Sequence, residues 1–222
     1  MLREPRSRTG EALLLIAAAA AAWAVTANRM EGMDMGPGTD LGGFGWFAGV
    51  WAAMMAAMML PSLAPRANVP FAAGFLLPWL AAGLLAYALI QGVRGLDPAF
   101  LAWGRAGPYV AGGVIAAAAL YELTAAKQLC LRRCRQLEPG PLLRGVENGV
   151  WCIGCCWALM AALFALGAMS VGWMVLIAAL IAAEKLLPST LGATRFSAAL
   201  LFVLGIAVAF APEQVPGLTI PG

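Results

Sequence analysis

Long, uninterrupted runs of apolar residues dominate the chain and predict its elements. Seven runs cover residues 12–27, 44–63, 71–90, 109–128, 149–168, 171–187 and 196–211. They are rich in Ala and Leu and do not alternate between apolar and polar positions, so helices are predicted and a barrel is not. Most runs come close to the roughly 20 residues that cross a bilayer core. The pattern predicts an all-α, polytopic membrane helix bundle of seven transmembrane helices, with six as the alternative count.

The composition supports a membrane protein. Hydrophobic residues make up 62% of the chain and charged residues 11%, whereas soluble domains carry about 45–50% and about 25%. The longest loop, residues 129–148, is too short for a second domain, so residues 1–222 are expected to form a single transmembrane domain. The first run follows a basic start; a cleaved signal peptide is therefore the alternative to an uncleaved first helix.

The distribution of basic residues predicts the orientation. With a cytoplasmic N-terminus, only Arg29, Arg94 and Arg105 lie in outer loops. The inner side then holds Arg3, Arg6, Arg8, Arg66, Lys127, Arg132, Arg133, Arg135, Arg144, Lys185 and Arg195. This asymmetry follows the positive-inside rule and indicates a multi-pass protein of the bacterial inner (cytoplasmic) membrane. The net charge of +3 reflects topology, and no nucleic-acid partner is predicted.

Sulfur is the chemistry that the chain offers. It contains no histidine but five cysteines and eleven methionines. The lack of histidine removes the usual general base and the commonest metal ligand, and no phosphate-binding glycine loop is present. No catalytic residue is predicted, and the chain is not expected to be an enzyme.

The cysteines form two clusters, which are Cys130 with Cys134 and Cys152 with Cys155 and Cys156. Residues four apart share a helix face, so Cys130 pairs with Cys134 and Cys152 with Cys156. Cys155 shares that face less well, and Met160 extends it by one turn. Antiparallel helices joined by one loop would bring both clusters to one depth near the cytoplasm. Thiolates select soft ions such as Cu(I) and also suit Zn, although buried cysteines also serve as small apolar side chains.

Two groups of methionines extend this pattern. Thioethers are neutral, soft ligands for Cu(I), while methionine is also a common filler of apolar interiors. The predicted ligands are Met54, Met55, Met58 and Met59 in the second run and Met30, Met33 and Met35 in the outer loop. The outer methionines lie beside Glu31 and Asp34, which would help to capture copper.

Glu122 is the carboxylate most suggestive of function. It lies inside the fourth run, and a carboxylate at that depth usually faces the bundle interior or a water-filled path. It could ligate a metal, carry a proton or pair with Lys185. Lys127, five residues further on, is expected to be a poor partner because it does not share a helix face with Glu122. Glu184 is expected to make an interhelical hydrogen bond.

Three motifs carry a family resemblance. They are Met54-Met55-Ala-Ala-Met58-Met59 before Pro61, Tyr121-Glu122-Leu-Thr124 before Cys130 and Cys134, and Cys152-Ile-Gly154-Cys155-Cys156-Trp157 before Met174 and Glu184. Together they resemble a prokaryotic family of predicted metal-binding integral membrane proteins, over about residues 46–185. Family members often carry Gln at the position of Glu122. The resemblance implies a metal-binding membrane protein.

Three functions remain open. The first is soft-metal handling or transport, with copper as the expected ion, zinc or another soft metal as alternatives, and a metallochaperone or metalloenzyme as partner. The second is a membrane thiol–disulfide redox protein that uses Cys152 and Cys155, whose spacing is that of a dithiol motif. The third is a structural or assembly subunit of a membrane complex. A homo-oligomer is compatible with all three.

Overall fold

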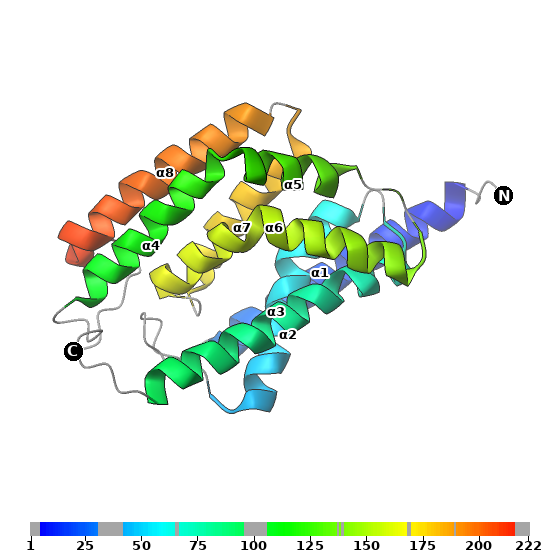
Figure 1. The fold of residues 1–222 in the computed structure, drawn as a ribbon. Coiled ribbons are helices and arrows are strands. Elements are labelled where there is room, and N and C mark those ends of the chain that lie inside the picture. The colour runs from blue at the N-terminus through cyan, green and yellow to red at the C-terminus, as the bar shows by residue number, and fades with distance from the viewer. Residues whose placement is uncertain are drawn as a thin grey trace. The chain divides into compact units, whose positions relative to one another are not determined.

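The computed structural model describes an α-helical protein (Figure 1). It describes residues 5–30, 42–64, 67–95, 106–136, 138, 140–167, 170–188 and 190–215. The helices are α1 (Pro5–Met30), α2 (Phe44–Leu63), α3 (Val69–Gly95), α4 (Gly107–Glu122), α5 (Ala125–Arg135), α6 (Leu142–Gly167), α7 (Val171–Leu186) and α8 (Thr190–Phe210), followed by a 3₁₀ turn, η2 (Pro212–Gln214). There is no strand in these ranges, so the all-α prediction is confirmed.

Five helices are long and apolar enough to cross a membrane. They contain Thr9–Met30, Phe44–Leu63, Val69–Gly92, Leu142–Gly167 and Leu191–Phe210, and the bent pair α4 and α5 would make a sixth. The predicted sixth run forms α7, which has only 16 residues and falls short of the roughly 20 that span a bilayer core. The count of seven spans therefore stays a prediction.

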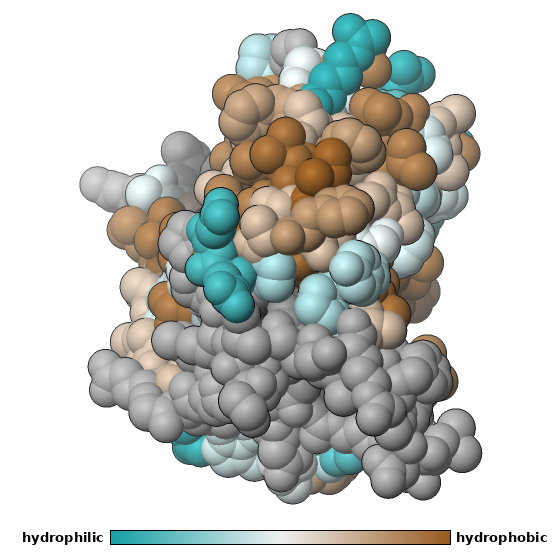
Figure 2. All heavy atoms as spheres, turned by 90° about the vertical axis from the view of Figure 1, so that its left-hand side faces the viewer, coloured by the Kyte–Doolittle hydropathy of each residue, from teal (hydrophilic) through white to brown (hydrophobic). Residues whose placement is uncertain are grey.

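Apolar side chains cover much of the outer surface of the helices. Leu120 on α4 and Val203 and Phe210 on α8 expose more than 60% of their surface. Figure 2 shows such hydrophobic residues gathered in a broad brown field on the face it presents. Soluble monomers rarely expose large continuous apolar areas, so this surface is compatible with a membrane protein.

The chain divides into two compact units. The first comprises Met1–Arg29, Gly42–Tyr87 and Cys130–Gly154, and the second comprises Met30–Leu41, Ala88–Leu129 and Cys155–Gly222. Helices α5 and α6 each pass from one unit to the other without a break. The expectation of a single transmembrane domain stays a prediction.

Glycines hold α3 and α6 close together within the first unit. A Cβ on Gly145 would collide with the backbone carbonyl of Phe71, and one on Gly149 would lie 2.6 Å from the carbonyl oxygen of Phe75. Gly74 on α3 meets the backbone of α6 in the same way. Gly145 and Gly149 form a small-x3-small motif, which lets helix backbones approach closely in membranes. The motif fixes the N-terminal half of α6, which carries Cys152.

A buried hydrogen bond joins α2 to α3 in the first unit. The indole N–H of Trp51 donates to the carbonyl oxygen of Trp79 at 2.8 Å. Gly83, one turn further on, leaves room for this indole, because a Cβ there would overlap Trp51. The bond satisfies a donor that would otherwise be buried without a partner.

In the second unit α4 lies along α8 (Figure 1). Their backbones meet at Gly112 and Gly205, where a Cβ on Gly112 would lie 2.6 Å from the carbonyl oxygen of Gly205. Glycines thus allow α4 and α8 to approach each other closely, as they do for α3 and α6 in the first unit.

The predicted fourth span is broken at Leu123 and Thr124. The helix pair α4 and α5 bends there by 68°. The hydroxyl of Thr124 donates to the carbonyl of Tyr121 at 2.8 Å and accepts the amide N–H of Lys127 at 3.2 Å. Threonine therefore ends one helix and caps the N-terminus of the next. The break redirects α5, which carries Lys127, Cys130 and Cys134.

Candidate metal centre

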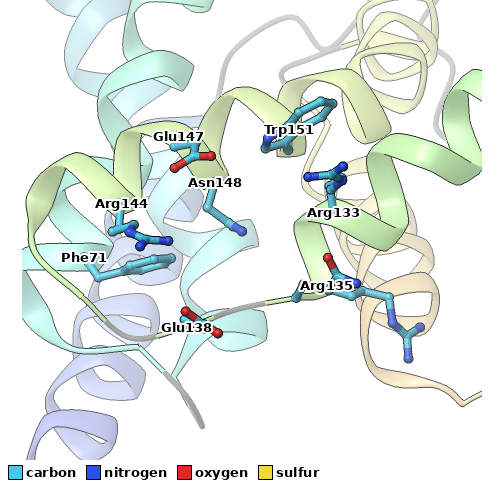
Figure 3. A pocket seen from close by; sticks show the side chains of 9 residues that line it. Phe71, Arg133, Arg135, Glu138, Arg144, Glu147, Asn148 and Trp151 are labelled. Carbon is cyan, nitrogen blue, oxygen red and sulfur yellow. The ribbon is translucent and has the colours of Figure 1, made fainter.

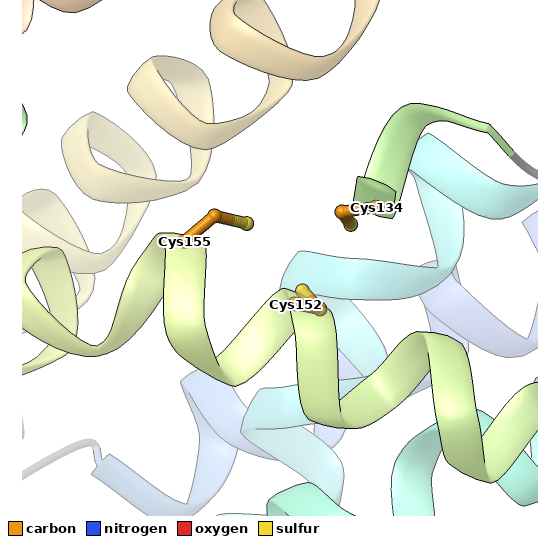
Figure 4. A group of neighbouring side chains, drawn as sticks. All are labelled: Cys134, Cys152 and Cys155. Atoms are coloured by element: carbon orange, nitrogen blue, oxygen red, sulfur yellow. The ribbon is translucent and has the colours of Figure 1, made fainter. Parts of the chain in front are cut away.

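Three cysteine thiols converge at one point. The Sγ atoms of Cys134, Cys152 and Cys155 all lie within 4.8 Å of one another, and the three residues are buried. Cys134 comes from the last turn of α5, and the other two from successive turns of α6, as Figure 4 shows. The unit boundary falls at Gly154–Cys155 inside α6, so Cys152 and Cys155 keep their spacing through one continuous helix.

The group differs from the predicted pairing. Cys155 joins Cys152 and Cys134, whereas the spacing of four residues predicts that Cys156 shares the face of Cys152 better than Cys155 does. Residues three apart in a helix are neighbours, as are residues four apart. The direction from which α5 approaches therefore decides whether Cys155 or Cys156 lies beside Cys134. The amide Nδ2 of Asn148, one turn before Cys152, donates to the carbonyl of Cys134 at 3.3 Å and ties the end of α5 to α6.

The two remaining cysteines lie beside this group. The Sγ of Cys156 is 3.4 Å from that of Cys155. Cys130 is packed against Gly154, where a Cβ would lie 2.7 Å from its Sγ. None of the five cysteines forms a disulfide, so each keeps a sulfur atom that could bind a metal.

The geometry of the three thiols fits a soft metal ion. Three atoms no more than 4.8 Å apart all lie within about 2.8 Å of a common point, and metal–thiolate bonds are about 2.3 Å long. Shifts of about half an ångström per sulfur would therefore bring the three thiolates into bonding distance. Thiolate sulfur selects Cu(I) and Zn over hard cations, so these residues suit copper.

The predicted methionine ligands have mixed positions. Met54, Met55, Met58 and Met59 are buried within α2 in the first unit, Met160 is buried on α6, and Met30 is buried at the end of α1. Met33 and Met35 lie outside the described residues. Burial suits both an apolar core and a thioether ligand, so their role in copper binding stays a prediction.

Glu122 is part of a buried ion triad in the second unit. The Nζ of Lys127 lies 2.6 Å from an oxygen of Glu122 and 2.8 Å from one of Glu184, and the exposure of all three side chains is 0–1%. The expectation that Lys127 is a poor partner is wrong, because the break at Thr124 removes the helical spacing on which it rested. The predicted partner Lys185 lies next to Glu184 and is also buried.

Comparison with known proteins identifies the family. The family model described as "PpoB2: Copper chaperone" matches residues 48–208 of the 222. The chain belongs to the PpoB2 copper chaperone family. No similar protein was found among curated proteins, and no similar fold among solved structures.

PpoB2 membership and the cysteine group agree on the chemistry. A copper chaperone family and three convergent thiols both support metal handling, with copper as the metal. The description of the family as a copper chaperone points to a metal-handling role. The resemblance drawn from the motifs is thereby confirmed as to a metal-related family, and all three motifs fall within the matched residues.

Sequence reasoning missed Asn148 and the partnership of Lys127 in this PpoB2 protein. Thr124 three residues before Lys127 is a capping signal that would have revealed the helix break. Gly145 and Gly149 form a visible small-x3-small motif, which would have indicated the face of α6 that meets α3. No sequence signal pairs Asn148 with the carbonyl of Cys134, because that bond depends on where α5 ends.

Proposed function

We propose that the protein is a membrane-embedded copper chaperone that holds Cu(I) between the thiolates of Cys134, Cys152 and Cys155. The observation that carries the proposal is the mutual distance of at most 4.8 Å among these three buried sulfur atoms. A single buried cysteine is ordinary packing. Three converging from two helices form a preorganised soft site.

The donor set favours Cu(I) over zinc. Structural zinc sites are almost always tetrahedral with four protein ligands. The group found among the described His, Cys, Asp and Glu residues has three ligands. Thiolates are the ligands that select Cu(I). Each thiol must lose its proton when the metal binds, so copper affinity is expected to fall as the pH is lowered.

The membrane setting supplies a direction for copper. Five long apolar helices support a bilayer location, and the excess of basic residues supports a cytoplasmic N-terminus. In that orientation Met33 and Met35 of the outer loop would capture copper, and the methionines of α2 would line its passage. Neutral thioethers would then hand the ion to stronger thiolates near the cytoplasm. A static site that loads a metalloenzyme partner would use the same cysteines.

The test is copper stoichiometry in purified protein. The detergent-solubilised protein is loaded anaerobically with Cu(I), freed of excess metal, and analysed for bound copper. Serine variants of Cys134, Cys152 and Cys155 should each lose most of the tightly bound copper. Cys130→Ser is the matched control, since Cys130 is outside the group, and should retain it. Undiminished copper in the three variants, or a wild-type protein without copper, would refute the proposal.

The proximity of Cys152 and Cys155 supports a second candidate, a dithiol that exchanges disulfides. Their sulfur atoms belong to the same group within 4.8 Å, and they have the spacing of a redox motif. Trapping thiols by alkylation in native membranes separates the two functions. A reversible Cys152–Cys155 disulfide favours redox exchange, whereas thiols that stay reduced and are protected by copper favour the chaperone.

A further inference from the structure

A polar pocket opens next to the cysteine group within the first unit. It has a volume of about 560 Å³, in the roughly 300–1,000 Å³ range of small-molecule sites. Its walls come from the end of α5 and the N-terminal half of α6, with Phe71 of α3 as an apolar side. Figure 3 shows Arg133 and Arg144 reaching into it from these two helices. Its concave form fits a small ligand.

The charges of the pocket favour an anion. Three arginines line it, Arg133, Arg135 and Arg144, against two glutamates, Glu138 and Glu147, which leaves a formal excess of one positive charge (three minus two). Arginine forks match carboxylates in a bidentate manner. The glutamates would accept hydrogen bonds from an ammonium group. A ligand that carries carboxylates together with an amine could therefore pair with both the arginines and the glutamates of the pocket.

Asn148 links the pocket to the cysteine group. Its side chain lines the pocket and is only 8% exposed. Its Nδ2 donates to the carbonyl of Cys134, so one residue both lines the pocket and holds the end of α5 that carries a thiol. The ligand that the charges favour, with carboxylates and an amine, has the chemistry of an amino acid or a short peptide.

The pocket is built from residues interleaved with the metal ligands. Arg133 and Arg135 flank Cys134 in sequence, and Trp151 precedes Cys152. The guanidinium of Arg133 lies 5.7 Å from the ring centroid of Trp151. A peptide bound here would lie against the two segments that carry the thiols, on the side predicted to face the cytoplasm.

We propose that this pocket binds a short, carboxylate-bearing peptide thiol that exchanges Cu(I) with the cysteine group. The exchange part rests on the proposed copper function. In the exchange one copper–sulfur bond to the peptide breaks as one to a cysteine forms. The cysteine proton passes to the peptide sulfur, and copper remains Cu(I). Because Cys134 is only 2% exposed but is the second-last residue of α5, its exposure requires movement of one helix end.

The experiment uses the tripeptide γ-glutamyl-cysteinyl-glycine as probe on the full chain in nanodiscs. Calorimetry without copper should detect binding, and the S-methylated probe should bind equally, because the carboxylates are recognised. Arg144→Glu should weaken binding by at least about tenfold, as expected for a lost charged hydrogen bond. Arg132→Glu is the matched control, since Arg132 is exposed on α5 and does not line the pocket. No binding, or equal weakening by both variants, overturns the pocket.

A second readout tests the exchange. Copper transfer from the Cu(I)–peptide complex should be slowed at least about tenfold in Arg144→Glu, while loading from a Cu(I)–acetonitrile complex should be unchanged. Equal transfer rates in wild type and variant overturn the exchange. Failure of copper to bind from either donor refutes the proposed function instead and leaves the calorimetric result on the pocket standing.

Discussion

Replacing Lys127 tests whether the buried ion triad organises the second unit. Lys127→Met keeps the length and apolar stem of the side chain but removes the ammonium between Glu122 and Glu184. In the native protein this ammonium lies 2.6 and 2.8 Å from the two carboxylates, and all three side chains are essentially inaccessible. Without it, two carboxylates of like charge face each other away from water.

The expected cost follows from this burial. Removing one partner of a buried ion pair typically destabilises a protein by about 3–5 kcal/mol, because the charge left behind is uncompensated. Neutralising the remaining carboxylates should recover much of the loss. The triple variant Lys127→Met, Glu122→Gln, Glu184→Gln is therefore expected to be more stable than Lys127→Met alone, because amides can hydrogen-bond without a buried charge.

Reversible unfolding in mixed micelles, followed by tryptophan fluorescence, measures these differences. Arg132→Met on the same helix is the control; its side chain is exposed, and a change within about 0.5 kcal/mol is expected. The reasoning is refuted if Lys127→Met unfolds like Arg132→Met. It is equally refuted if the triple variant is no more stable than the single one.

Three further predictions concern helix contacts. Gly145→Ala should lower the free energy of unfolding by about 1–3 kcal/mol, as overpacking does, because its Cβ would strike the backbone of Phe71. The control Gly113→Ala, which has open space around its Cβ, should be neutral or stabilising. Equal effects of the two variants in an unfolding titration would contradict the close packing of α3 and α6. Trp51→Phe should cost about 1 kcal/mol for the lost hydrogen bond to Trp79, and an unchanged unfolding midpoint would argue against that bond. Gly154→Ala should displace the side chain of Cys130, whose Sγ and Cβ would lie 2.7 and 3.3 Å from the added Cβ. Copper bound per chain should be unchanged if Cys130 is not a ligand, and a loss of copper in Gly154→Ala together with a loss in Cys130→Ser would contradict that.

The helices were largely predictable because apolar runs mark them directly. The predicted run 44–63 is α2 (Phe44–Leu63), and 171–187 differs from α7 (Val171–Leu186) by one residue. The fourth run was predicted as one helix, since its hydropathy continues through Leu123 and Thr124. Local hydrogen bonds of the Thr124 hydroxyl overrode that pattern.

The sequence predicted that cysteines would form the candidate site, but only partly which of them lie together. The clustering of Cys134, Cys152 and Cys155 was expected, since two neighbouring segments carry all the cysteines. The choice of Cys155 over Cys156 depends on the approach of α5, which the bend at Thr124 sets and no helical spacing encodes. The pocket beside Asn148 likewise depends on where α5 ends.

The most direct test of copper binding by Cys134, Cys152 and Cys155 is X-ray absorption at the copper edge of the Cu(I)-loaded protein. The account predicts one copper ion per chain in an all-sulfur environment of three ligands, unchanged in Cys130→Ser and reduced in sulfur number in Cys155→Ser. A coordination shell dominated by nitrogen or oxygen, or a sulfur shell insensitive to Cys155→Ser, would contradict it.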